Sequence, residues 1–205
     1  MSELPLYLAA LSAAYLLPGP DMALLLALTA SRGRVAGLGV AGGLALSRSL
    51  HVLASGLGLA TLLAAHPALF VGLRWLGGAY LFWLAWLLLR PSREAGSAAS
   101  REVAPNLGRQ AFRQGLLTNL LNPKAFLFCA LFLPQFVHPQ AGNLAGQYAF
   151  LGVILVAVGL FYDLLYVFLL DVIRRGGLVG WGDGRYWRRG TALLFALLGI
   201  RVLLP

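Results

Sequence analysis

The sequence predicts an all-α polytopic membrane protein with six transmembrane helices. Of its 205 residues 60% are hydrophobic, and the mean hydropathy is +0.79, whereas a soluble domain is about 45–50% apolar. Charged residues make up only 11% of the chain, against roughly 25% in a soluble domain. Because a membrane-spanning helix needs about 20 apolar residues, the chain has room for about six spans and no sizeable domain outside the membrane.

Six apolar segments follow one another and are the expected helices. They cover residues 4–29, 37–64, 68–90, 114–137, 145–171 and 188–205. The uncharged run at 125–162 is too long for one span, and the Pro and Gly residues of 138–143 mark the turn that divides it. The sixth segment gives the weakest signal, because it is short and carries Arg201 near its end.

Basic residues alternate between the loops, and this pattern sets the orientation. The loop between segments one and two contains two arginines, whereas those between three and four and between five and six contain five each. The turns at 66–67 and 138–143 contain no Lys or Arg. Since basic loops face the cytoplasm in membrane proteins, we expect both the N-terminus and the C-terminus in the periplasm.

The chain divides into two halves of three segments each, residues 1–90 and 114–205. Between them, residues 91–113 are rich in Ser, Ala, Gly, Arg and Glu, which predicts a mobile cytoplasmic loop. Because three is an odd number, the second half enters the membrane from the opposite side. This arrangement predicts a 3+3 inverted repeat, a common plan among secondary transporters.

The first segment is expected to be a broken helix. Pro18, Gly19 and Pro20 lie inside it and Asp21 follows directly. Each proline lacks an N–H and disrupts the helix that precedes it, and the freed carbonyls must then face protein or a wet cavity. A simple proline kink is the alternative. Two prolines around a glycine, followed by an acid, favour a functional break at which a new half-helix starts.

The fourth segment is broken at the corresponding position of the second half. Pro123 lies between Asn122 and Lys124, with Asn119 one turn earlier. A lysine inside an apolar run costs about 2.5–3.5 kcal/mol, which favours a buried pair with a carboxylate over a side chain that reaches the cytoplasmic edge. Paired breaks point to the binding site of a transporter. The predicted substrate-binding residues there are therefore Asp21, Asn119, Asn122 and Lys124.

Three further polar residues fall inside apolar segments. Asp163, in segment five, is the candidate for proton coupling, because burial favours the protonated form of a carboxyl group. A structural bond from Asp163 to Arg48 or Lys124 is the alternative. Arg48 and His51 are three residues apart on one face of segment two, and they are candidates for the substrate site, with a structural role open for His51.

Other features narrow the function classes. Gly39 and Gly43 form a GxxxG pattern, which predicts close helix packing and permits a homodimer. The single cysteine, Cys129, excludes an intrachain disulfide and paired-cysteine metal motifs. The sequence has no nucleotide-binding loop and no nucleophile elbow, so we expect no enzyme and no cofactor, and transport driven by a gradient. The arginines form no patch for nucleic acid.

The sequence resembles the LysE/RhtB family of amino-acid exporters along almost its whole length. The resemblance lies in PGPDMALL at 18–25, in GLLTNLLNPKA at 115–125 and in FLPQF at 132–136. GGAYL at 77–81 and Asp163 support it. It implies a bacterial inner-membrane protein that exports amino acids or close derivatives, driven by the proton gradient. Segment two departs from the family, since Arg48 precedes His51 where small or polar residues are usual, and this leaves the substrate open.

A zwitterionic substrate needs an acid for its amine and a positive partner for its carboxylate. Asp21 or Asp163 can hold the amine, and Lys124, Arg48 or the half-helix N-termini can hold the carboxylate. We expect Asp21 and Lys124 to face one cavity. The alternative function is a metal- or inorganic-ion transporter of the same architecture. Two acids and one histidine inside the segments are few ligands for a divalent metal, so no metal site is predicted.

Overall fold

The computed structural model describes residues 3–58, 65–89, 106–175 and 184–204, and every element in these ranges is a helix. The elements are α1 (Leu4–Leu16), α2 (Pro20–Arg32), α3 (Arg34–Gly56), α5 (Pro67–Leu89), α6 (Leu107–Leu120), α7 (Pro123–Phe132), the short η1 (Leu133–Phe136) and η2 (Pro139–Ala141), α8 (Leu144–Arg175) and α9 (Gly184–Leu203). Most of the predicted loop, at 91–105, lies outside the described residues.

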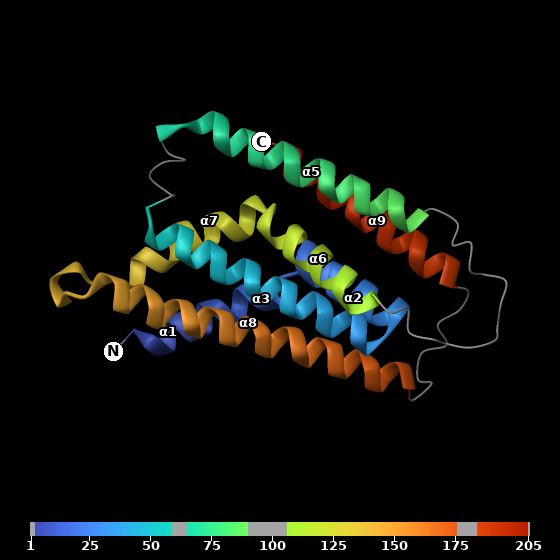
Figure 1. Cartoon of the computed structure of the whole chain (residues 1–205), viewed down its shortest axis with the longest axis horizontal. Coiled ribbons are helices and arrows are strands. Elements are labelled where there is room, and N and C mark those ends of the chain that lie inside the picture. Colours follow the sequence, from blue (N-terminus) through green and yellow to red (C-terminus); the bar gives the residue numbers. More distant parts are fainter. Residues whose placement is uncertain (1–2, 59–64, 90–105, 176–183, 205) are drawn as a thin grey trace.

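The first and fourth predicted segments are each divided into two helices, as the prolines indicated. The axes of α1 and α2 meet at 57°, and those of α6 and the α7–η1 unit meet at 59°; the second bend is visible between α6 and α7 in Figure 1. Both α2 and α7 begin with a proline, Pro20 and Pro123. A proline at the first helical position loses no hydrogen bond, so the helix can restart there.

The number of candidate spans is smaller than the six predicted. Three helices, α3, α5 and α8, contain a stretch that is long and apolar enough to cross a membrane, and each bent pair can add one, giving three to five among the described residues. The sixth segment does not qualify because α9 carries four arginines in its 20 residues. These are Arg185, Arg188, Arg189 and Arg201.

Helix α6 begins earlier than predicted, inside the stretch assigned to a mobile loop. Its first residue is Leu107, so residues 107–113 are helical. The reason is close packing against α3. A Cβ atom added to Gly39 would lie 2.5 Å from the Gly108 carbonyl oxygen and 3.1 Å from Cβ of Ala111. This contact stabilises the start of α6 before its apolar part begins.

The GxxxG pattern is used within the chain. Like Gly39, Gly43 faces α6, where an added Cβ would collide with the carbonyl oxygen of Phe112. Gly115 of α6 approaches α3 in the same way, because a Cβ added to it would lie 2.5 Å from the carbonyl oxygen of Val40. The pattern on which the possible homodimer rested therefore packs α3 against α6.

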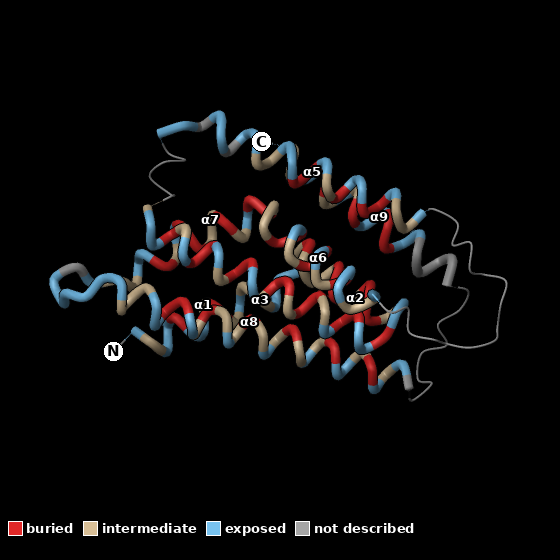
Figure 2. The backbone as a smooth tube through the Cα atoms, in the orientation of Figure 1, coloured by how far each residue is buried: buried red, intermediate tan, exposed pale blue. Residues whose placement is uncertain are grey.

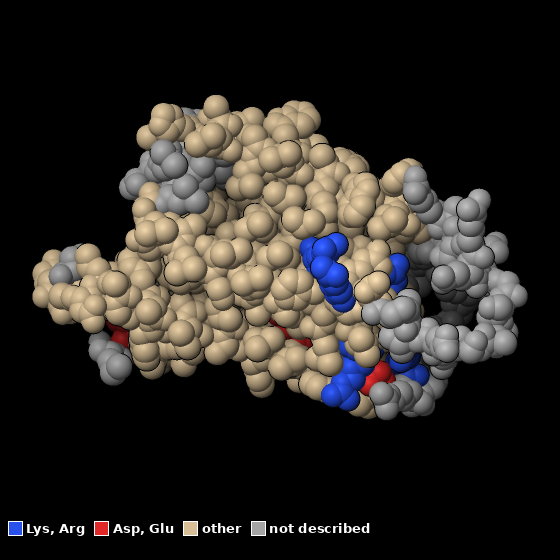
Figure 3. Space-filling model, viewed as in Figure 1, with Lys and Arg blue, Asp and Glu red and all other residues tan. Residues whose placement is uncertain are grey.

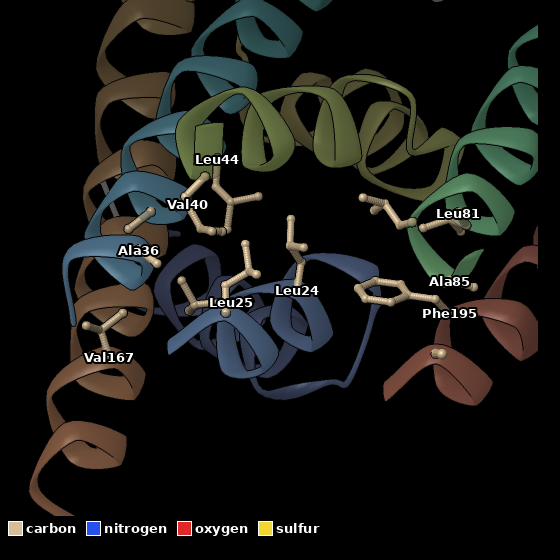
Figure 4. Close-up of a cluster of buried hydrophobic side chains, with 14 residues drawn as sticks. Leu24, Leu25, Ala36, Val40, Leu44, Leu81, Ala85, Val167 and Phe195 are labelled. Carbon is tan, nitrogen blue, oxygen red and sulfur yellow. The ribbon is translucent and has the colours of Figure 1, made fainter. Parts of the chain in front are cut away.

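The main core joins both halves of the chain. Figure 4 shows Leu24 and Leu25 of α2 beside Val40 and Leu44 of α3, with side chains of α5 and α9 closing the cluster. Buried residues line the inner sides of the helices, and α5 is exposed over much of its length (Figure 2). Large apolar side chains are exposed on the outside, among them Val153 at 68%, as expected where lipid replaces water as the solvent.

Charged side chains are unevenly distributed over the surface. On the face seen in Figure 3, basic side chains gather toward the end at which α2 and α8 finish, and most of the rest carries no charge. The exposed basic residues near this end are Arg32, Arg34, Arg109, Arg113 and Arg174. The described parts of the loops predicted to be cytoplasmic therefore lie together at one end of the helix bundle.

Candidate functional site

A cavity of about 640 Å³ lies where the two helix breaks meet, within the usual range of roughly 300–1,000 Å³ for ligand pockets. Residues from α1, α2, α3, α6, α7 and α8 and from both breaks line it. All the residues predicted for substrate binding or proton coupling are among them. They are Asp21, Arg48, His51, Asn119, Asn122, Lys124 and Asp163. Of the residues predicted to break the helices, Gly19 and Pro20 also line the cavity.

Asp21 connects the two breaks through side-chain amides. Asn119 donates a hydrogen bond from Nδ2 to Oδ2 of Asp21, and Asn122 donates from Nδ2 to Oδ1 at 3.4 Å. The side-chain oxygen of Asn122 also accepts from the backbone N–H of Lys124 at 3.1 Å and so caps α7. Asp21 itself lies in the first turn of α2, where the helix dipole favours a negative charge.

Lys124 does not form the buried ion pair that its position predicted. Its side chain is exposed, and among the described residues no carboxylate lies within ion-pair distance of it. Lys124 follows Pro123 in the first turn of α7 and lines the cavity. The prediction was wrong because this turn of α7 borders an open cavity and not a packed interface.

Arg48 and Asp163 neutralise each other on the cavity wall. The guanidinium of Arg48 donates from two nitrogens to the two carboxylate oxygens of Asp163, at 2.5 Å and 3.2 Å. The two side chains are only 5% and 8% exposed. A bidentate pair of this kind is both strong and directional. Of the two structural partners considered for Asp163, the structure selects Arg48.

His51 lies in the same cavity as Arg48, one turn further along α3. Its Nε2 is 3.4 Å from the carbonyl oxygen of Leu120, the last residue of α6. Its ring meets Phe126 edge to face at 5.7 Å. Within the described residues its Nδ1 is buried without a hydrogen-bond partner. His51 thus connects α3 to the end of α6.

A group of tyrosines in the cavity wall was not predicted from the sequence. Tyr15 places its ring under the guanidinium of Arg48, at 4.9 Å, and donates its hydroxyl to the carbonyl oxygen of Leu155 at 3.0 Å. Tyr166 donates its hydroxyl to the carbonyl oxygen of Tyr15 at 3.4 Å. In an unbroken helix, the backbone N–H of Gly19 would donate a hydrogen bond to that carbonyl oxygen. The sequence feature that could have identified them is the position of Tyr162 and Tyr166 close to Asp163 on α8.

The described ranges contain no group of three or more His, Cys, Asp or Glu side chains placed to hold a metal ion. The residues that line the cavity include two acids, two bases, one histidine and three amides among apolar and tyrosine side chains. Such a set suits a small organic molecule that carries both charges.

Comparisons with known proteins identify the family of this chain. The family model of the LysE type translocator matches residues 12–205. An uncharacterized membrane protein of Pseudomonas aeruginosa is 41% identical over 160 residues, which cover 75% of this chain and 72% of that protein. No solved structure matches.

Two further relatives carry functional names. The threonine efflux protein of Escherichia coli K12 is 30% identical over 195 residues, 91% of this chain and 90% of that protein. The homoserine/homoserine lactone efflux protein of Salmonella typhimurium is 37% identical over 128 residues, 62% of this chain and 59% of that protein. Because the family model covers nearly the whole chain, this multi-pass membrane protein belongs to the LysE type translocator family.

Proposed function

We propose that the protein is a secondary-active exporter of amino acids across the bacterial inner membrane. The relatives named as threonine and homoserine efflux proteins support this function. The observation that carries it is the charge arrangement in the cavity. Arg48 and Asp163 are paired with each other, whereas Asp21 and Lys124 line the same space without an ion pair among the described residues.

The two unpaired charges suit the two ends of a zwitterion. Asp21 binds the substrate amine, because the amides of Asn119 and Asn122 hold its carboxylate in place without neutralising it. Lys124 binds the substrate carboxylate. Neither Arg48 nor Asp163 is available for these roles while they neutralise each other. The alternatives left open by the sequence therefore narrow to Asp21 for the amine, and to Lys124 or the half-helix N-termini for the carboxylate, of which we propose Lys124.

Proton exchange at Asp163 would couple export to the proton gradient. Protonation removes the charge that Arg48 binds, and an uncompensated buried charge is costly. Because Arg48 belongs to α3 and Asp163 to α8, the loss of this pair favours a different arrangement of the two helices. Export in exchange for protons then follows if substrate release and proton binding favour the same arrangement.

In the orientation that we propose, the basic end of the helix bundle faces the cytoplasm and both termini lie in the periplasm. The nearly equal bends of 57° and 59° support an inverted repeat whose two halves meet at the cavity. A cysteine introduced at Asn143 is expected to react with an impermeant reagent from the periplasm, and one at Arg109 is not. The reverse labelling would contradict the orientation. The native Cys129 is buried and gives a low background.

Export can be measured as uptake of labelled amino acids into everted membrane vesicles. We expect uptake by the wild type, a strong reduction when the proton gradient is collapsed, and loss of uptake in Asp21→Asn and Lys124→Gln. Arg109→Gln is the matched control, because it removes an exposed positive charge of α6 outside the cavity. Uptake that does not depend on the proton gradient would contradict the antiport mechanism but not the exporter function. Absence of uptake for every amino acid would contradict the exporter.

A further inference from the structure

The cavity has a polar end at the helix breaks and an apolar part beyond them. α1 runs toward its break and α7 runs away from the other, so both extend from the breaks on the same side (Figure 1). On α1 the lining residues Ala10, Ala13 and Ala14 share one face of the helix. On α7 the facing residues are Leu127, Phe128, Leu131 and Phe132.

The far end of this apolar part is closed by aromatic rings. Tyr7 of α1 stacks on Phe132 at 5.5 Å and meets Phe136 edge to face at 4.8 Å. On the α7–η1 wall beyond Lys124, Gln135 is polar, and its side-chain amide already donates to the carbonyl oxygen of Leu131 at 2.9 Å. The space between α1 and α7 therefore offers contact area but few polar partners.

The charges in the cavity balance. Of the described lining residues, Asp21 and Asp163 are acidic and Arg48 and Lys124 are basic. With Arg48 bound to Asp163, one negative and one positive group remain, and an α-amine and an α-carboxylate occupy both. A charged substrate side chain would enter the apolar part without a counter-ion, which is strongly unfavourable.

We infer that the transported substrate is an amino acid with no net charge and a bulky apolar side chain, which lies between α1 and α7. This inference rests on the proposed exporter function. It differs from the substrates named for the threonine and homoserine relatives, because a side-chain hydroxyl placed in this space would lose its bonds to water and find few polar partners to replace them. The alanine face of α1 leaves the width that a branched or aromatic side chain needs.

The first test compares substrates in everted vesicles that contain the wild-type protein. Labelled leucine and phenylalanine represent apolar side chains, threonine and homoserine hydroxylated ones, and lysine and glutamate charged ones. We expect leucine to be transported with an efficiency about tenfold or more above that of threonine, and lysine and glutamate to stay at the level of empty vesicles. Preferred transport of threonine or lysine would overturn the inference but leave the exporter function intact. Absence of transport for all six would instead contradict the exporter function.

The second test changes the α1 wall of the cavity by a substitution at Ala13. Ala13→Leu narrows the space between α1 and α7, so the KM for leucine and phenylalanine should rise about tenfold while that for threonine changes little. Retained threonine transport shows that the variant folds. Ala9→Leu is the matched control, because Ala9 lies on the same helix, is exposed and does not line the cavity.

An unchanged ratio of leucine to threonine transport in Ala13→Leu would show that lipid chains, and not the substrate, fill the apolar part, and it would overturn the inference. If Ala13→Leu does not fold, the substrate panel with the wild type decides by itself.

Discussion

The cavity contains two pairs of opposite charges that are built differently. Arg48 and Asp163 come from the continuous helices α3 and α8 and form a buried bidentate ion pair. Asp21 and Lys124 come from the first turns of α2 and α7, directly after the helix breaks. They form no ion pair within the described ranges, and amides hold Asp21.

The difference shows what a helix break contributes to a site. In a continuous helix the backbone groups are already bonded, so a buried charge must find another charge, as Arg48 finds Asp163. At a break, peptide groups and side-chain amides are free to hold a carboxylate without neutralising it, as around Asp21. The first pair is therefore neutralised within the fold, whereas the second pair is the one that we propose to bind the ligand.

The largest expected effect on stability comes from breaking the buried ion pair of Arg48 and Asp163. Asp163→Asn leaves Arg48 buried without a counter-ion, and the free energy of unfolding in detergent should fall by about 3–5 kcal/mol. The double variant Arg48→Gln with Asp163→Asn should recover part of this loss, which a double-mutant cycle measures. Proton-driven export should be lost in both. Additive effects of the two substitutions would show that the pair does not hold α3 and α8 together.

A smaller effect is expected from moving the helix that carries Arg48. A Cβ on Gly43 would collide with the carbonyl oxygen of Phe112 and lie 2.6 Å from the backbone nitrogen of Leu116, and neither backbone atom can move aside. Gly43→Ala should therefore destabilise the protein by about 1–3 kcal/mol. Gly42→Ala is the control, because the nearest atom to its Cβ is the ring of Phe112 at 3.4 Å. Equal melting temperatures for the two variants would contradict this account of the α3–α6 contact.

Substitutions of Asp21 and Lys124 are expected to have the smallest effect on stability. Their effect on transport should be large. Asp21→Asn and Lys124→Gln should each change the free energy of unfolding by about 1 kcal/mol or less, with little coupling between them, because Lys124 is exposed and the half-buried Asp21 forms no ion pair among the described residues. Each should weaken substrate binding on the order of 30-fold, since a charged partner of the substrate is lost. A strong coupling in the substrate-free protein would show that Asp21 and Lys124 pair directly and that the two charge pairs are alike.

Several features of the fold and the site could be predicted because they depend on local chemistry. A proline cannot donate a backbone hydrogen bond wherever it stands, so Pro20 and Pro123 indicated both breaks. The restart of each helix at its proline follows from the same property. Asp163 was recognised because an acid in an apolar helix requires a partner, although the sequence could not choose between Arg48 and Lys124. That choice depends on which helices lie side by side.

Other expectations failed because they depended on packing. The start of α6 was assigned to a loop on composition, yet Gly39 of α3 brings the two helices close enough for the helix to begin at Leu107. Lys124 was expected to be buried because of its place in an apolar run, yet its turn of α7 borders the cavity. The tyrosines were overlooked because an aromatic residue in an apolar helix gives no sign of which side chain it will contact.

By itself the sequence determined the membrane class, the two helix breaks and the charged and polar residue types inside the apolar segments, because hydropathy, proline geometry and charge are properties of single residues and short segments. Only the tertiary structure decided that Arg48 is paired with Asp163 and that Asp21 is held by amides. It also decided that alanines of α1 face the apolar side of α7. These arrangements depend on distances between residues that are far apart in the chain, and helix packing alone sets those distances.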